Sequence, residues 1–550
     1  MNSWIREKGV GKSAAAANIL LRSNTSQAFP APYSLLPTPL TARPNFIPHS
    51  YLKETGDFDM VDLDYLKLSK PQKMLHDLGQ FFARLPGRIG GGLKGLALAV
   101  GRCLKGLGLS IADLFTTFKN GDWKTRLSYL VMGSGSMARG QWGRGLLFFL
   151  FQTVFNLYMV NFGIGYLSKL NTLGVVETYK EGRKTVYGDN SFLILLYGVL
   201  TLFFVAAFIY TWRVNIKQNK ISQQLLASGH KLKSTKDDLA SLADSQFHKT
   251  LLALPTLGVF VFTILPIFFM ILVAFTNFDY NHQPPAKLFT WVGLENFRTL
   301  LSSGTASYGD TFRQVLFWTL VWAFFATFLN YFLGMLVAIM INKKGIRLKK
   351  VWRTILVMTI AIPQFVSLLY VSKMFAADGL INTYLMKWHW ISQPIPFWTD
   401  PGWARFTIIL INIWIGIPYL MLIATGILMN IPADLYESAR IDGANAMQMY
   451  GKITLPYMLF VTGPYLLTSF TGNINNFNVI FLLSQGKPMG LAGNAGYTDL
   501  LITWLYRMTV TDTNYKIAAV IGIMVFVVLA VINLVVYNLI PSVKNEEDFQ

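Results

Sequence analysis

The sequence predicts an all-α polytopic membrane protein with eight transmembrane helices. Charged residues make up only 14% of the 550 positions, about half the share that is usual in soluble domains. The mean hydropathy is +0.41. Eight apolar segments contain no Asp, Glu, Lys, Arg or His, and each is long enough for a helix of about 20 residues, which crosses a bilayer. Soluble, collagenous and disulfide-built chains are therefore excluded.

The eight segments divide the chain unevenly. Two of them follow a long N-terminal region, and six follow a polar linker. This division predicts a tail (1–145), two accessory transmembrane helices (146–212), a cytoplasmic linker (213–250) and a six-helix region (251–545). The predicted helices are 146–168, 191–212, 251–275, 314–341, 354–372, 406–430, 457–483 and 517–540.

The N-terminal tail shows two patterns. Residues 1–80 mix Ser, Thr, Pro, Asn and charges without a sustained period, which is typical of disorder. Between Arg84 and Lys119, apolar residues recur at helical spacing with basic residues between them, as in a helix that lies on a membrane surface. Because eight glycines fall between Gly87 and Gly108, an irregular tail stays open as the alternative.

Basic residues predict the orientation in the membrane. The net charge of +20 comes from 48 Lys+Arg against 28 Asp+Glu. If both termini are cytoplasmic, 35 of the 48 basic residues lie inside, six of them in the short loop 342–353. Topology and attraction to anionic membrane lipid account for the charge. We therefore expect a multi-pass protein of the cytoplasmic membrane, with both termini inside and no nucleic-acid partner.

Sites for chemistry are missing from the sequence. The six histidines are scattered through predicted loops without metal-ligand spacing, and the predicted spans contain no ionisable group for a nucleophile, base or proton pathway. Two glycine-rich segments that mimic nucleotide-binding loops lack the strand that such loops follow. We predict no catalytic residue, no metal and no bound cofactor. A transporter or channel for a neutral solute, powered by another protein, fits this pattern.

The loop 431–456 is the most informative segment. Pro432 suits a first helical turn, and Asp434 and Glu437 suit its positive end. Gly443 can adopt the left-handed conformation that ends a helix, and a second short helix is expected after it. The loop is therefore predicted to form a helix, a glycine bend and a helix at the cytoplasmic face.

The same loop resembles the EAA loop of ATP-binding-cassette importer permeases. The matching residues are Glu437, Ser438, Ala439, Asp442, Gly443, Ile453, Leu455 and Pro456, with serine as a small departure at the second position. The resemblance implies that a separate ATPase subunit, which uses ATP, docks on this loop. The residues expected to couple the two subunits are Glu437, Ser438, Ala439, Asp442, Gly443 and Met447.

Further segments resemble the eight-span permeases of maltose and maltodextrin importers. They are Trp291–Phe297, Asp378–Asn382, Asn473–Phe477 and Gly496–Leu501. This resemblance implies a type I importer core of six helices preceded by two extra helices. It also implies a second permease subunit, two copies of a cytoplasmic ATPase and an extracellular solute-binding protein as partners. Alternatives are a permease for another neutral sugar or for glycerol phosphate, and a secondary carrier.

Two predicted helices each carry a polar face. Residues at spacings of three, four and seven share one side of a helix. Such amides and hydroxyls in hydrocarbon need partners, so the faces either join neighbouring helices as polar contacts or line a wet cavity. Resemblance to maltose permeases implies the second alternative, a sugar site. In this sequence Gly472 stands where an aromatic residue can occur in that family. Tyr419 is therefore the better candidate for stacking on a sugar ring. The faces are Asn412, Ile415, Gly416 and Tyr419, and Ser469, Gly472, Asn473 and Asn476.

Overall fold

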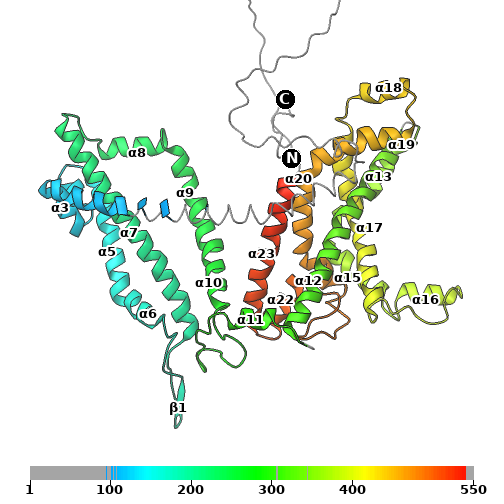
Figure 1. Ribbon diagram of the computed structural model, residues 1–550, viewed down its shortest axis with the longest axis horizontal. Coiled ribbons are helices and arrows are strands. Elements are labelled where there is room, and N and C mark those ends of the chain that lie inside the picture. Colours follow the sequence, from blue (N-terminus) through cyan, green and yellow to red (C-terminus); the bar gives the residue numbers. More distant parts are fainter. Residues whose placement is uncertain are drawn as a thin grey trace, which may run out of the picture. The chain divides into compact units, whose positions relative to one another are not determined.

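The computed structural model describes residues 108–304, 307–343 and 345–539, together with isolated positions between 95 and 106. By its contacts the chain divides into residues 1–106 and 107–550, and all the elements below belong to the second unit. This unit is built almost entirely of helices (Figure 1). Seven helices in the described residues are long and apolar enough to cross a membrane: Trp142–Lys169, Ser191–Ala227, Phe247–Val273, Tyr308–Asn342, Pro401–Leu428, Ala446–Ile474 and Tyr515–Tyr537.

The predicted all-α membrane fold is confirmed, but the expected span 354–372 is not straight. It forms two helices, α14 (Lys349–Ala361) and α15 (Gln364–Met374), which are bent by 92°. The bend lies at Pro363, which has no backbone N–H to continue the helix and holds Ile362 in an extended conformation. The chain therefore has eight spans only if this bent pair counts as one.

Four of the seven straight spans contain a π-helical turn. Such a turn accommodates one extra residue and shifts the helical face of the residues that follow it. The segments are α5 (Trp142–Tyr158), η2 (Met159–Gly163) and α6 (Ile164–Lys169); α9 (Phe247–Val259), η3 (Phe260–Ile264) and α10 (Leu265–Val273); α12 (Tyr308–Phe324), η4 (Phe325–Leu329) and α13 (Asn330–Asn342); and α19 (Ala446–Met449), η5 (Tyr450–Thr454) and α20 (Leu455–Ile474). The other spans are α7 (Ser191–Ala227), α17 (Pro401–Leu428) and α23 (Tyr515–Leu539).

The two accessory spans pack against each other through aromatic rings. Phe155 of α5 stacks on Phe208 of α7 with 3.9 Å between ring centroids, and the Tyr158 hydroxyl lies 2.9 Å from the Thr201 hydroxyl. Between the two spans, strands β1 (Tyr179–Glu181) and β2 (Lys184–Val186) pair as an antiparallel hairpin, which projects from the end of the spans in Figure 1. This end is called the hairpin side below, and the opposite end, which carries the loop 429–445, is the loop side.

Parts of the predicted tail and linker are folded on the loop side. Helices α3 (Trp123–Leu130) and α4 (Ser134–Met137) pack against the end of α7, which continues to Ala227 beyond the predicted boundary at 212. Helix α8 (Thr235–Ala243) packs against α5. Arg139, whose side chain is 1% exposed, binds Asp122 at 2.5 Å and Asn219 at 2.7 Å. Residues 108–144 and 213–227 are folded because α7 supplies buried polar partners such as Asn215 and Asn219. The expected disorder concerns residues 1–80, which lie outside the described residues. Most of the expected surface helix 84–119 lies outside the described residues.

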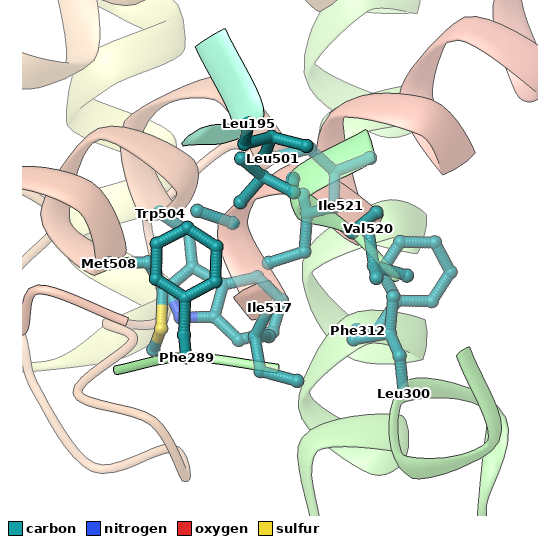
Figure 2. Close-up of a cluster of buried hydrophobic side chains, with 14 of the residues drawn as sticks. Leu195, Phe289, Leu300, Phe312, Leu501, Trp504, Met508, Ile517, Val520 and Ile521 are labelled. Atoms are coloured by element: carbon teal, nitrogen blue, oxygen red, sulfur yellow. The ribbon is translucent and has the colours of Figure 1, made fainter. Parts of the chain in front are cut away.

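A cluster of buried side chains joins the accessory spans to the six-helix region on the hairpin side (Figure 2). Leu195 of α7 and Phe289 of the loop between α10 and α11 (Glu295–Leu301) contribute to it, together with side chains of α11, α12, α22 (Leu501–Val510) and α23. Trp504 is fully buried and donates its indole N–H to the Gly493 carbonyl at 2.9 Å. The remaining helices are α16 (Leu380–Lys387), α18 (Ala433–Ile441) and α21 (Phe477–Leu483).

Candidate functional site

A cavity of about 480 Å³ lies among α13, α17, α20 and the break between α14 and α15. Helices α13 and α17 approach closely because Gly334 has no side chain, and a Cβ there would lie 2.6 Å from the Leu420 Cβ. The cavity is lined by amides, hydroxyls, aromatic rings and aliphatic groups. Its lining residues are Ala326, Asn330, Thr359, Ile360, Ala361, Ile362, Pro363, Gln364, Ser367, Asn412, Trp414, Ile415, Gly416, Tyr419, Leu420, Tyr465, Ser469 and Asn473.

Six of the eight residues predicted to contact sugar line this cavity. All four of the α17 face are present, and two of the α20 face. Tyr419 is 52% exposed, so its ring is available to the cavity, whereas Asn412 is 7% exposed. The structure thus brings together two faces that are far apart in the sequence: Asn412, Ile415, Gly416 and Tyr419 with Ser469 and Asn473.

The other two predicted residues, Gly472 and Asn476, are not among the lining residues. Helix α20 ends at Ile474, so the seven-residue spacing from Ser469 does not place Asn476 on the same helical face. Its side chain instead caps α21, accepting a hydrogen bond from the Val479 N–H at 3.3 Å. Gly472 faces open space, since a Cβ there would meet no atom within 4 Å. The expectation of one continuous face was wrong at this end.

Hydrogen bonds from α12 and η4 fix the position of Asn473. Its side-chain amide donates to the Thr327 hydroxyl at 2.9 Å, and its backbone carbonyl accepts a hydrogen bond from the Trp322 indole N–H at 3.1 Å. Its Oδ1 accepts from the Asn476 amide at 3.3 Å. Asn476 therefore supports the site indirectly, through Asn473.

Sequence reasoning missed the contribution of α13 and α15. Asn330 follows the π-helical turn η4, is 5% exposed, and has an Oδ1 atom without a hydrogen-bond partner. Gln364 and Ser367 reach the cavity because α15 begins after the break at Pro363. Two features of the sequence could have indicated these residues. Asn330 is an asparagine within an apolar span, and Gln364 is a polar residue directly after a proline, as in broken transporter helices.

The cavity has no formal charge. None of the described residues that line it is Asp, Glu, Lys, Arg or His. In the part of the chain that the structure describes, no three His, Cys, Asp or Glu side chains are grouped as metal ligands. The lining can donate and accept hydrogen bonds and can stack on a ring, and these interactions suit a neutral polyhydroxylated solute.

The loop predicted to contact an ATPase forms the expected helix and glycine bend. Helix α18 is followed by Gly443, which has a left-handed φ of 79°. The Ala444 N–H donates to the Ala439 carbonyl at 2.8 Å and so closes the helix end. The second helix, α19, begins at a capping box formed by Asn445 and Gln448, and continues without a break through η5 into α20. A movement of this loop can therefore be passed directly to the helix that carries Asn473.

The predicted coupling residues lie mainly on the surface of this loop. Glu437, Ser438, Asp442, Gly443 and Met447 are exposed, and Ala439 is half-buried. Met447 is 76% exposed, and the neighbouring Ile441 is 86% exposed. Both are large apolar side chains at the tip of a polar loop, which is typical of a surface that binds another protein.

Comparisons with known proteins agree with these features. Residues 330–545 match a family described as "Binding-protein-dependent transport system inner membrane component". The chain is 34% identical to the maltodextrin transport system permease protein MdxF of Bacillus subtilis (strain 168), over 77% of this chain and 97% of that protein. It is 34% identical to the maltodextrin permease MalC of Streptococcus pneumoniae (strain ATCC BAA-334 / TIGR4), with the same coverage. It is 33% identical to the galactooligosaccharides permease GanP of Bacillus subtilis (strain 168), over 76% of this chain and 97% of that protein.

Proposed function

The chain belongs to the binding-protein-dependent inner membrane components, the permeases of ATP-binding-cassette sugar importers, and we propose that it carries maltodextrin-type oligosaccharides through the cavity beside α17 and α20. It is a multi-pass membrane transport protein and not an enzyme. The observation that carries the proposal is the chemistry of the cavity: amides, hydroxyls and exposed aromatic rings, with no charge among its described lining residues. Sugar hydroxyls need donors and acceptors, and sugar rings stack on aromatic faces.

The partners follow from the family and the exposed loop. We propose that the chain forms half of the translocation pathway with a second permease subunit and receives sugar from an extracellular solute-binding protein. The importer would contain two copies of a cytoplasmic ATPase subunit, one of which docks on the loop of this chain. ATP drives transport only if the ATPase has different contacts with two permease states. The exposed Met447 and Ile441, on a loop continuous with α20, support this loop as the contact. Both termini face the cytoplasm, as the basic loop 342–353 favours.

A second substrate class has specific support. The galactooligosaccharides permease is nearly as similar to this chain as the maltodextrin permeases, and a neutral cavity does not discriminate between the two sugars by charge. Glycerol phosphate is disfavoured, because phosphate recognition uses arginine or lysine and the described lining contains neither.

Uptake in cells tests the proposal. A strain lacking this chain is complemented with the parent gene or an empty vector, and uptake of labelled maltotriose, a galactotriose, sucrose and glycerol phosphate is measured. We expect loss of maltotriose uptake and its return with the parent. Restoration of galactotriose uptake alone would transfer the assignment to the second substrate class. Equal uptake of every solute with and without the chain would refute both.

A further inference from the structure

The boundary between apolar and polar surface on α7 lies at Trp212. From Phe192 to Trp212 the helix contains no charged residue, and Arg213 is the first of a basic series. The depth of α5 in the membrane follows from its ring contacts with α7. Phe151 and Phe155 of α5 both pack against Phe208, about one turn before Trp212. The transition from hydrocarbon to lipid headgroups on the loop side therefore lies about one turn beyond these rings, where tryptophan is favoured.

The C-terminal end of helix α3 lies at this boundary. The Tyr129 ring contacts the Trp212 ring edge to face at 5.7 Å, and the Trp212 indole N–H donates to the Tyr129 carbonyl at 3.0 Å. The end of α3 reaches deeper, because the Gln152 amide of α5 donates to the Leu130 carbonyl at 2.9 Å. Since Gln152 is next to Phe151, Leu130 lies at the level of the lipid tails.

The outer surface of this region is apolar. Trp123 and Leu130 are seven residues apart on α3 and are 65% and 77% exposed. Phe115, in the preceding helical residues 108–120, is 74% exposed. Leu130 lies at the depth of the lipid tails, whereas Phe115 and Trp123 lie beside the basic part of α7 at headgroup level, near Lys220 and Gln223. Exposed apolar side chains at both levels are explained by contact with lipid.

Beside this surface, residues 108–120 and α7 enclose a cavity of about 360 Å³. Arg213, Lys217 and Lys220 line it from one face of α7, at spacings of four and three residues. Lys220 pairs with Asp113 at 2.5 Å. Arg213 and Lys217 have no hydrogen bond or ion pair within the described residues.

We propose that this cavity binds the headgroup of an anionic glycerophospholipid from the loop-side leaflet. The phosphate lies between Arg213 and Lys217, and the acyl chains run along the exposed apolar side chains of residues 108–130. Three features favour a lipid: the cations lie at headgroup level, two of them lack partners among the described residues, and the adjoining apolar surface extends to tail level at Leu130. The site ties the folded region 108–144 to the membrane, and it shares no lining residue with the sugar cavity.

Lipid binding to the full-length chain tests the proposal. The chain is purified in mild detergent and titrated with phosphatidylglycerol, phosphatidylcholine or inorganic phosphate, and bound lipid is counted by native mass spectrometry. We expect one tight phosphatidylglycerol and at least tenfold weaker phosphatidylcholine. The double variant Arg213→Gln with Lys217→Gln should bind phosphatidylglycerol about 25-fold more weakly, since each basic residue near an anionic headgroup contributes roughly fivefold.

Two control variants separate the site from general effects. Lys231→Gln with Lys236→Gln removes the same charge from exposed positions on the same side and should leave the affinity unchanged. Arg213→Lys with Lys217→Arg keeps the charge and should retain binding, which shows that the region still folds. Parental phosphatidylglycerol affinity in the double glutamine variant would overturn the proposal. Displacement of the lipid by millimolar inorganic phosphate would overturn the lipid assignment and indicate a site for free phosphate.

Discussion

Gly416 of α17 packs against the side chain of Asn330 of α13 in the wall of the candidate sugar cavity. A Cβ atom at position 416 would lie 2.3 Å from the Asn330 Nδ2, closer than such atoms can approach. The Asn330 side-chain amide donates to the Asn412 backbone carbonyl at 3.5 Å. This bond fixes the orientation of the amide, because a flipped amide would place the Asn330 Oδ1 against the Asn412 carbonyl oxygen. Gly416 therefore sets the position of a buried amide whose Oδ1 has no hydrogen-bond partner.

Gly416→Ala should reduce transport by displacing Asn330. Overpacking of this kind costs about 1–3 kcal/mol of stability, and the displaced amide alters the cavity wall. We expect at least a tenfold fall in maltodextrin uptake and a lower melting temperature. Gly426→Ala in the same helix is the control, because a Cβ there meets nothing within 4 Å. Equal uptake by both variants, at matched membrane expression, would show that Gly416 does not shape the pathway.

Asn473→Leu and Asn476→Leu should have different effects. Asn473 lines the cavity, so its loss should abolish uptake while assembly and basal ATP hydrolysis persist. Asn476 caps α21, so its replacement should lower stability by about 1 kcal/mol and change uptake less than threefold. Thr327→Val, which removes only a hydrogen-bond partner of Asn473, should give an intermediate result. Parental uptake by Asn473→Leu would place the pathway elsewhere.

Gly443→Val should uncouple ATP hydrolysis from transport. The residue has a φ of 79°, which a β-branched side chain strongly disfavours. The bend would open, and the loop would lose the shape that we propose contacts the ATPase. Gly443→Asn should retain more activity, because asparagine tolerates this conformation. The measurement is sugar-stimulated ATP hydrolysis beside uptake in proteoliposomes, and normal coupling in the valine variant would contradict the assignment.

Asp189 should make stability depend on acid pH. Its carboxylate accepts hydrogen bonds from the Lys169 ammonium and from the Val175 and Val176 N–H groups, which lower its pKa to about 2. A depressed pKa stabilises the fold above the unfolded value of 3.8 and loses this contribution as pH falls toward 2. Asp189→Asn should lower the free energy of unfolding by about 2 kcal/mol at pH 7. In thermal unfolding, the stability of this variant should fall less than that of the parent between pH 5 and 2.5. Glu181→Gln in the exposed hairpin is the control, and an identical pH profile in Asp189→Asn and the parent would contradict the linkage.

The orientation can be tested by cysteine labelling. In a Cys103→Ala background, a cysteine at Arg183 in the hairpin should react with an impermeant reagent added to whole cells. A cysteine at Lys231, on the loop side, should react only after the cells are opened. The reverse pattern would invert the proposed topology.

Seven of the eight predicted apolar segments each overlap a single membrane-spanning helix, because apolar length is a local property of the sequence. The bend was harder to predict, since Pro363 lies in a segment that is apolar on both sides. Prolines also occur inside continuous helices here, as Pro418 in α17 and Pro464 in α20 show. Whether a proline kinks a helix or divides it depends on the neighbouring helices that satisfy the freed backbone groups.

The candidate site was predictable where a helix continued and unpredictable where it ended. Spacing alone placed Asn412, Gly416 and Tyr419 on one face, and the structure keeps them together along the cavity. The same reasoning failed at Asn476, because the periodicity does not reveal that α20 ends at Ile474. Asn330 could not be assigned to the cavity, since its approach depends on how α13 crosses α17.

The sequence by itself determined the class of protein, the membrane spans and the helix–glycine–helix loop, because each depends on residues close together in the chain. It also carried the family resemblance through the motif from Glu437 to Pro456. Only the tertiary structure decided which polar residues share the cavity, and that Arg213 and Lys217 face residues 108–120. These contacts join segments about 80 to 150 residues apart, and helix packing determines them through the close fit of side chains that local periodicity does not encode.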